Sequence, residues 1–262
     1  VVNAATRERD ASWIRLHLSP DAAFQDRSDE TAKIDVQGPR SRECLEAALD
    51  RRLPDLRYLR SADVRIDGTP VQVSRTGYTG EFGYELYLPA DDTPRFWDAL
   101  VRHPGLKPAG LGARDTLRLE IGYPLYGRDL NETMTPVEAG GMGFMCMDRP
   151  FMGREAVRRR QREGAARVLT PLVLEGRGAA RPHDRVRAGD RSAGEVTSGA
   201  FAPSLGVAVA LAAMHPEHAA PGTRLKIESR RRALSAVVGR LPFYTGGSCR
   251  KRSTGGGSKT GT

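Results

Sequence analysis

The chain has 262 residues, of which 39% are hydrophobic and 28% charged, a composition typical of a folded protein with one large domain or two modest ones. No apolar run reaches the roughly 18–20 residues that a membrane helix needs, and no charged-then-apolar leader opens the chain. The sequence therefore predicts neither a membrane span nor a secretory signal. The formal net charge of +9 is compatible with nucleic acid, an acidic protein or a polyanionic small ligand as partner.

The cysteines and histidines predict no metal site. Cys44, Cys146 and Cys249 are far apart and odd in number, so they form neither a zinc motif nor a disulfide framework. The five histidines occur at no ligand spacing. This cysteine usage suits a reducing compartment, and we expect a cytoplasmic protein.

The first fifty residues predict helices around one strand. We expect Val1-Val2 to lie in a buried strand, and Asp10 to cap a short helix that ends at His17. A strand is expected at 32–36. The turn Gln37–Pro39 then leads into a helix, because proline is favoured at the first helical position. The buried stripe of that helix is predicted to hold Leu45, Ala48 and Leu49.

A glycine-rich hairpin follows. Its predicted strands, 71–74 and 84–88, flank a connection rich in glycine. Because side chains alternate along a strand, Glu85 and Tyr87 share the face opposite Leu86. Two interpretations of Glu85 stay open at this point. It is either a solvent-exposed strand carboxylate or an acceptor for the paired N–H donors of a planar heterocycle.

Two helices come next. Thr93-Pro94 begins the first, and the second is expected from Leu111 to Ile121. The apolar residues at helical spacing in the first are Phe96, Trp97, Leu100 and Val101. Arg114 and Arg118 lie one turn apart on the second helix. They are either surface residues or a pair that holds an anionic group bidentately.

The second half of the chain predicts a connecting helix, a small β-barrel and a tail. Residues 153–162 are rich in arginine but contain no aromatic residue, so we expect a solvated helix rather than a nucleic-acid surface. Short β runs separated by turn residues are typical of a barrel. They are expected at 168–174, 193–197, 206–211, 224–228 and 233–238. Residues 245–262 hold mostly glycine, serine and basic residues, and we expect them to be disordered.

Three blocks of residues carry a specific signature. In chain order they are Ser74–Glu81 with Gly83–Leu86, then Gly110–Glu120 with Leu125–Gly127 and Thr135–Gly140, and last Gly194–Gly199 with Pro203–Gly206 and Leu241–Phe243. Together these blocks resemble the glycine cleavage system T-protein (aminomethyltransferase) family over residues 1 to about 244. The resemblance implies an α+β fold. Its parts would be a folate-binding domain at 1–150, a connecting helix at 151–167, a C-terminal β-barrel at 168–244 and a disordered tail at 245–262.

The resemblance also implies a reaction. T proteins take the aminomethyl group from the lipoyl arm of an acidic partner, the H protein. They release ammonia and convert tetrahydrofolate to 5,10-methylenetetrahydrofolate. By position, Glu85 matches the family carboxylate that binds the pterin, and Arg114 matches a ligand-binding arginine. Tyr244 lies near the place of a ligand-binding tyrosine. No metal, nucleic acid or membrane is implied.

The chain departs from the family pattern in three places. The N-terminal part of the family is absent, and it holds the aspartate at the reacting pterin nitrogen. Asp10, Asp26 and Asp29 match other positions, so the catalytic residue is unknown and we expect impaired turnover. Residues 141–148 differ from the usual tryptophan-containing or lysine-rich stretch, and Asp35 interrupts a strand that is usually apolar.

Two alternative functions stay open. One is a folate-dependent demethylase of the same superfamily, acting on sarcosine, dimethylglycine or a methylated sulfur compound. The other is a folate-binding module without transfer chemistry. Paralogues of that kind resemble a Lys-Gly-Cys-Tyr-x-Gly-Gln-Glu signature, which this sequence lacks.

Overall fold

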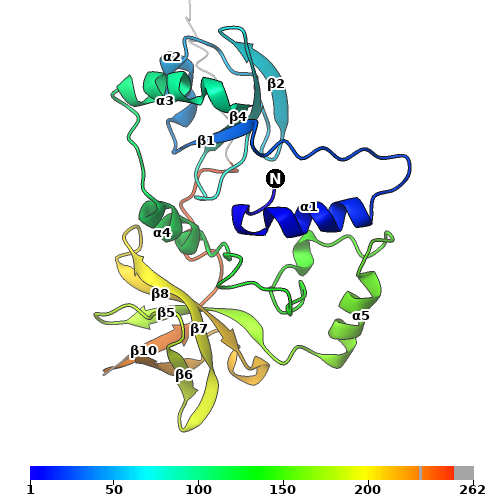
Figure 1. The fold of residues 1–262 in the computed structure, drawn as a ribbon. Coiled ribbons are helices and arrows are strands. Elements are labelled where there is room, and N and C mark those ends of the chain that lie inside the picture. Colours follow the sequence, from blue (N-terminus) through cyan, green and yellow to red (C-terminus); the bar gives the residue numbers. More distant parts are fainter. Residues whose placement is uncertain (230–231, 251–262) are drawn as a thin grey trace, which may run out of the picture. The chain divides into compact units, whose positions relative to one another are not determined.

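The chain folds as two compact units, each with its own layers of secondary structure (Figure 1). The structure is a computed structural model and describes residues 1–229 and 232–250. The first unit comprises residues 1–108 together with the segment that begins at Gly247, and the second comprises 109–246. The predicted α+β fold is confirmed, because the first unit packs helices on a sheet and the second contains a closed barrel. In the described residues, no helix combines the length and apolar character that crossing a bilayer requires.

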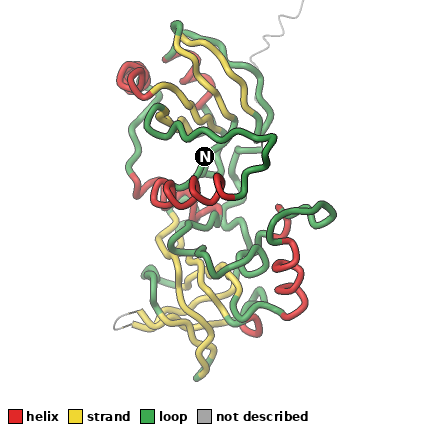
Figure 2. The backbone as a smooth tube through the Cα atoms, turned by 45° about the vertical axis from the view of Figure 1, so that its right-hand side comes forward, coloured by secondary structure: helices red, strands yellow, loops and turns green. Residues whose placement is uncertain are grey.

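A four-stranded antiparallel sheet forms the centre of the first unit, in the order β1-β4-β3-β2 (Figures 1 and 2). The strands are β1 Thr31–Gln37, β2 Ser61–Ile66, β3 Thr69–Ser74 and β4 Gly83–Pro89. Residue Val73 of β3 pairs with Leu86 of β4, which confirms the predicted hairpin. On the other side of β4, Asp35 of β1 pairs with Glu85. This second pairing joins segments that are far apart in the sequence.

Helices α2 Ser41–Ala48 and α3 Thr93–Arg102 cover one face of this sheet. The first unit also contains η1 Ala4–Thr6, α1 Arg7–Leu16 and η2 Ala90–Asp92. Tyr84, Leu86 and Leu88 point into a core to which α2 and α3 contribute Leu45 and Phe96. The predicted alternation along β4 is therefore confirmed, and Glu85 and Tyr87 lie on the opposite face.

Two expectations for this unit are wrong in detail. Val1 and Val2 form no strand and are 100% and 48% exposed, because two apolar residues without a paired neighbour do not define a strand. Asp10 lies inside α1 rather than at its start. Its carboxylate accepts a hydrogen bond from the Thr6 hydroxyl at 2.7 Å. On α3 only Phe96 and Leu100, four residues apart, are buried. The neighbouring Trp97 and Val101 are exposed.

The second unit begins with α4, which precedes a closed barrel in the strand order β10-β5-β8-β7-β6-β9 (Figure 2). Its helices are α4 Leu111–Ile121, η3 Met142–Phe144, α5 Arg154–Glu163 and η4 Pro216–His218. Its strands are β5 Val168–Glu175, β6 Arg185–Ala188, β7 Arg191–Ala202, β8 Val207–Met214, β9 Arg224–Ser229 and β10 Arg232–Val238. All five predicted β runs are confirmed. The short strand β6 was not predicted, because four residues with two arginines carry little β signal.

The segment after the barrel returns to the first unit. Ser248 is only 5% exposed; its hydroxyl contacts the Glu81 carboxylate and accepts a hydrogen bond from the Phe82 N–H at 2.8 Å. The Cys249 N–H donates to the carbonyl of Gly80 at 3.1 Å. Disorder is therefore the wrong prediction for 247–250, because polar groups rather than apolar side chains anchor them. The rest of the predicted tail, 251–262, lies outside the described residues.

Candidate functional site

Glu85 is a half-buried carboxylate on the polar face of the first unit's sheet. Its side chain is 14% exposed, so the interpretation as a solvent-exposed strand residue is wrong. The cause is the cross-strand neighbour β1, which places Lys33 and Asp35 on the same face. A carboxylate in this position requires partners for its oxygens, because an unpaired buried charge is costly.

Four side chains surround this carboxylate, and we call the group of Lys33, Asp35, Thr76, Glu85 and Tyr87 the Glu85 cluster. The Lys33 ammonium lies 2.7 Å from Oε1 of Glu85 and 3.3 Å from a carboxylate oxygen of Asp35. The hydroxyls of Thr76 and Tyr87 both donate to Oε2 of Glu85, the second at 3.1 Å. Both oxygens of Glu85 are therefore engaged.

These contacts set the charge of the cluster. Burial acts to raise the pKa of Glu85, but hydrogen bonds from Lys33 and Thr76 and the charge of Lys33 outweigh it and lower that pKa from 4.5 to about 2. Burial raises the pKa of Asp35, and the negative charge of Glu85 acts in the same direction. Burial and the Glu85 charge also raise the pKa of Tyr87. Glu85 is thus the carboxylate of the pair that stays ionised to lower pH.

Lys33 and Tyr87 also line a cavity of about 730 Å³ within the first unit. Its wall continues through Asn3, Ile14 and Phe24, which makes it mixed in polarity. A cavity of this size is in the range of small-molecule and cofactor sites. In the part of the chain that the structure describes, His, Cys, Asp and Glu side chains form no group of three that could hold a metal ion.

The aspartates near this cavity hold an arginine of its wall. Arg7 makes two parallel hydrogen bonds to Asp29, at 2.6 and 2.8 Å, and a third to Asp26 at 3.2 Å. Asp26 also accepts hydrogen bonds from the backbone N–H and hydroxyl of Ser28. Because their oxygens are committed in this way, Asp26 and Asp29 act in this structure as the ion-pair partners of Arg7.

Gln37 explains the glycines of the connection between β3 and β4. Its amide nitrogen donates to the carbonyls of Thr76 at 3.1 Å and Tyr84 at 3.3 Å. A Cβ atom added to Gly77 or Gly83 would overlap the Gln37 side chain. A side chain at either position would therefore displace the Gln37 amide, and this amide holds the loop that presents Thr76 to the Glu85 cluster.

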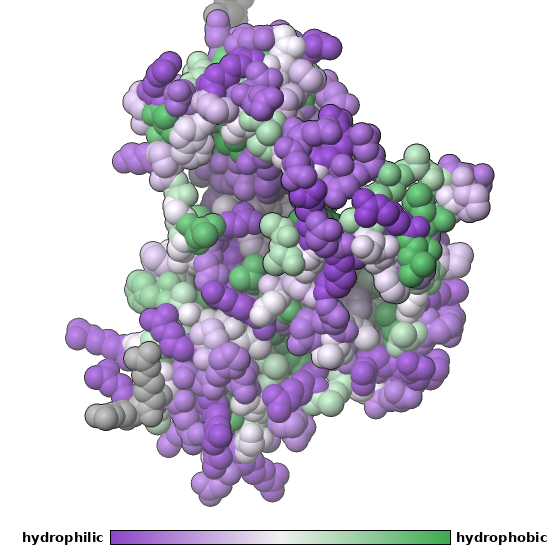
Figure 3. Space-filling view, in the orientation of Figure 1, coloured by the Kyte–Doolittle hydropathy of each residue, from purple (hydrophilic) through white to green (hydrophobic). Residues whose placement is uncertain are grey.

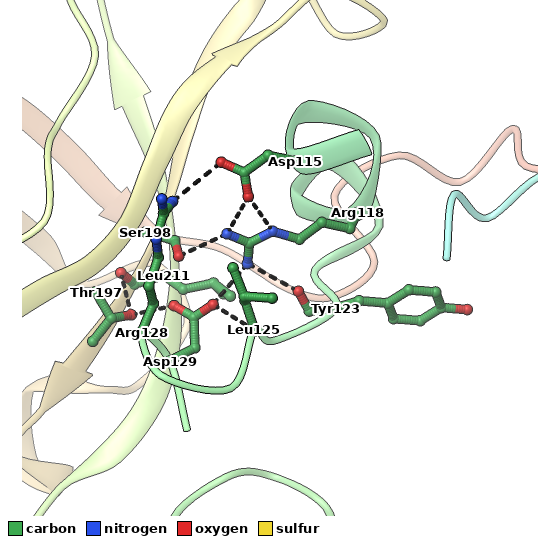
Figure 4. Close-up of polar contacts among 9 residues, drawn as sticks. All are labelled: Asp115, Arg118, Tyr123, Leu125, Arg128, Asp129, Thr197, Ser198 and Leu211. Atoms are coloured by element: carbon green, nitrogen blue, oxygen red, sulfur yellow. Dashed lines mark hydrogen bonds and ion pairs between the residues drawn. The ribbon is translucent and has the colours of Figure 1, made fainter. Parts of the chain in front are cut away.

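Arg118 has a different role from the predicted anion pair (Figure 4). It is 1% exposed, and its guanidinium binds Asp115 at 2.7 Å and the fully buried Asp129 at 2.6 Å. It also donates to the hydroxyl of Ser198 on β7 at 2.9 Å. The expectation that Arg114 and Arg118 together hold an external anion is wrong, because Arg118 is fully used in joining α4 to the barrel.

Arg114 and Tyr244 belong to the second unit. Arg114 is exposed on the first turn of α4. Tyr244 is half-buried, and its backbone N–H donates to the carbonyl of Glu120 near the end of α4 at 2.8 Å. Both predicted binding residues are therefore tied to α4, whereas Glu85 belongs to the first unit.

Lys33, Thr76 and Tyr87 were not predicted to bind Glu85. The only signal in the sequence is the alternation of Lys33 and Asp35 in an otherwise apolar segment. That alternation places both charges on one face, but it does not identify β4 as the neighbouring strand. The pairing of β1 with β4 skips two intervening strands and is set by the packing of the whole unit.

Comparison with known proteins adds the family. Residues 1–149 match the model of the GCVT N-terminal domain, and residues 167–245 match that of the glycine cleavage T-protein C-terminal barrel domain. Proteins named aminomethyltransferase from Bacillus mycoides (strain KBAB4) and Bacillus cereus (strain AH187) are 38% and 39% identical over 251 residues. These alignments cover 93% of this chain and 68% of each relative.

A solved structure agrees with these matches. The crystal structure of glycine cleavage system aminomethyltransferase T from Bartonella henselae superposes with a TM-score of 0.83 at 25% identity. The superposition covers 92% of this chain and 67% of that one. The chain therefore belongs to the glycine cleavage T-protein family, and the relatives it matches are aminomethyltransferases.

Proposed function

We propose that this enzyme, an aminomethyltransferase of glycine cleavage by family, takes tetrahydrofolate as one substrate and a lipoylated H protein as the other. The reaction moves the methylene unit of the aminomethyl group from the lipoyl arm to tetrahydrofolate. Ammonia leaves, and the lipoyl arm is left reduced. We place this chemistry in the bacterial cytoplasm.

The observation that carries the proposal is the half-buried carboxylate of Glu85, paired with Lys33 at 2.7 Å and next to a cavity of about 730 Å³. A pterin ring presents adjacent N–H groups, and a carboxylate is the side chain that accepts two such donors at once. The cavity wall offers the apolar surface of Ile14 and Phe24 to a flat heterocycle. The residues present therefore fit a folate.

We assign three binding residues. Glu85 accepts hydrogen bonds from the pterin, the exposed Arg114 supplies a planar cation, and Tyr244 supplies a phenol. The catalytic residue is unassigned in this chain. We also propose the division into a folate-binding domain at 1–150, a connecting helix at 151–167 and a barrel at 168–244; the helix α5 and the closed barrel support it.

An activity assay tests the reaction. Aminomethylated, lipoylated H protein and tetrahydrofolate are mixed with the chain, and formation of methylenetetrahydrofolate and ammonia is followed. We expect both products in equal amounts. Turnover of sarcosine or dimethylglycine instead would indicate the demethylase. Folate binding without any turnover would indicate the binding module.

A further inference from the structure

The oxygens of Glu85 already have protein partners, and this determines how a ligand can reach them. A carboxylate has about four lone-pair sites. Oε1 accepts from the Lys33 ammonium at 2.7 Å, and Oε2 accepts from the hydroxyls of Thr76 and Tyr87. A heterocycle that offers two N–H donors must therefore replace some of these partners.

The two oxygens differ in how easily their partners can be replaced. The bond on Oε1 is charge-assisted, and removing the ammonium would leave a buried charge without compensation. The partners on Oε2 are neutral hydroxyls, which rotate at little cost. Thr76 also has a second partner within reach, because its hydroxyl lies 2.9 Å from that of Ser74. Exchange on Oε2 is thus the cheaper path.

We propose that Lys33 is a positioning residue of the folate site: its ammonium holds Oε1 and orients the charged Glu85 carboxylate, while Oε2 exchanges its hydroxyl partners for N–H donors of the ligand. This inference rests on the proposed function, because it takes folate as the ligand of Glu85. Lys33 and Tyr87 both line the cavity, so the exchange takes place at its wall.

The surroundings of Glu85 predict how ligand binding depends on pH when Lys33 is replaced. Lys33 and Asp35 face it from β1, Thr76 from the loop after β3, and Tyr87 from its own strand; its β3 partner is the uncharged Ser74. Lys33 is the cation of this group. Without it, two neighbouring carboxylates share the site, and one of them takes up a proton at higher pH. A protonated pair is a poorer acceptor for N–H donors.

The test is binding of tetrahydrofolate to the 262-residue chain, measured by calorimetry under anaerobic conditions between pH 5.5 and 8. We expect Lys33→Met to raise Kd by roughly tenfold at neutral pH, and by more as the pH falls. Lys33→Arg keeps the charge and restores most of the affinity. Arg65→Met is the matched control, because it removes one positive charge from β2 of the same sheet, where Arg65 is exposed and contacts the Gly68 carbonyl.

The ratio of the variant's Kd to that of the wild type is the decisive quantity, because titration of the ligand itself cancels in it. A ratio near one, or one that is constant with pH, overturns the inference while the proposed function stands. Lys33→Gln keeps a hydrogen-bond donor without the charge, so it serves as a second test if Lys33→Met fails to fold. A ratio of its Kd to the wild-type Kd that does not change with pH overturns the inference. If the wild-type chain binds no tetrahydrofolate, the proposed function itself fails.

Discussion

Glu85 and Leu86 are neighbours on β4 but face opposite sides of the sheet, so replacing them separates binding from stability. Glu85→Gln keeps the shape of the side chain and loses its charge. We expect it to weaken tetrahydrofolate binding by roughly tenfold or more, because ligand donors are left poorly paired in a desolvated site. Calorimetry at neutral pH measures the effect.

Leu86→Ala is the control for this experiment. Leu86 is fully buried, so its truncation leaves a cavity in the core and lowers the free energy of unfolding by about 2–5 kcal/mol. Folate affinity per folded molecule is expected to be unchanged. Equal affinity of Glu85→Gln and the wild type would show that the pterin is bound elsewhere.

Arg118 differs from Glu85 because its buried charge stabilises the fold and does not serve a ligand. Arg118→Met leaves the Asp129 carboxylate, 0% exposed, with hydrogen bonds from the Leu125 N–H and the Thr197 hydroxyl but without a cation. We expect a loss of about 3–5 kcal/mol in the free energy of unfolding. Urea denaturation measures it.

The matched comparison is Arg128→Met. Arg128 is 51% exposed and also binds Asp115, at 3.2 Å. An exposed pair of this kind contributes about 0–1 kcal/mol, so this variant should unfold almost like the wild type. If Arg118→Met and Arg128→Met lost the same free energy of unfolding, the buried Arg118–Asp129 pair would contribute no more to stability than an exposed pair.

At the scale of elements, α4 offers a comparison of two glycines. Gly122 ends the helix with φ +80°, and a Cβ atom there would also meet the Leu241 side chain. Gly122→Ala is expected to cost about 1 kcal/mol or more, because the left-handed conformation disfavours a side chain. Gly112 lies within the same helix with no atom near a Cβ, so Gly112→Ala is expected to stabilise by about 0.5–1 kcal/mol. Opposite shifts of the melting temperature are the expected result.

The ion pair that links α5 to the turn at 135–138 makes a contribution to stability that depends on pH. Glu138 accepts hydrogen bonds from the N–H and hydroxyl of Thr135 at 2.8 and 2.5 Å, and it pairs with Arg160 of α5 at 2.7 Å. Burial acts to raise the pKa of Glu138, but these hydrogen bonds and the Arg160 charge lower it below 4.5. Its contribution to stability is therefore present above pH 4.5 and is lost as the pH falls below that value.

Glu138→Gln tests this link. Because the variant has no carboxylate at that position, its free energy of unfolding should fall less than that of the wild type between pH 5 and pH 3. Arg160→Met removes one of the groups that lower the pKa, so it should also reduce the slope, by a smaller amount. Parallel curves for the wild type and Glu138→Gln would show that another group causes the acid loss.

Local patterns in the sequence predicted the elements, but not the partners that elements meet in space. The alternation of Glu85 with Leu86 and the turn residues between β runs are local, and they gave the hairpin and the barrel. The pairing of β1 with β4 and the burial of Arg118 against Asp129 depend on contacts between distant segments. The same is true of Ser248, whose buried site is built by Glu81 and Phe82. The composition of that segment predicted disorder because it holds no large apolar side chain, whereas the contacts that hold it are polar.

At the scale of the whole chain, the net charge of +9 is the main property. Hydrophilic side chains cover much of the surface seen in Figure 3, and the exposed helix α5 adds several arginines to it. We expect binding of the acidic H protein to be steered by this charge and to weaken as salt rises, because exposed charges are screened beyond ~8 Å at physiological ionic strength.

Surface plasmon resonance at rising sodium chloride measures this dependence, with most of the change in the association rate. Sucrose at matched osmolarity is the control, since it leaves charges unscreened. A dissociation constant that does not change with salt would contradict an electrostatic contribution. Replacing Arg159 and Arg162 by glutamine then tests whether α5 takes part.

The return of residues 247–250 to the first unit has a consequence for the order of synthesis. Translation completes residues 1–108 first and makes the whole second unit before it reaches Ser248. At roughly 5–20 residues per second, this interval is on the order of 10 s. During that time the N–H of Phe82 lacks its Ser248 partner on a growing chain. The first unit to emerge from the ribosome is therefore the last to be finished.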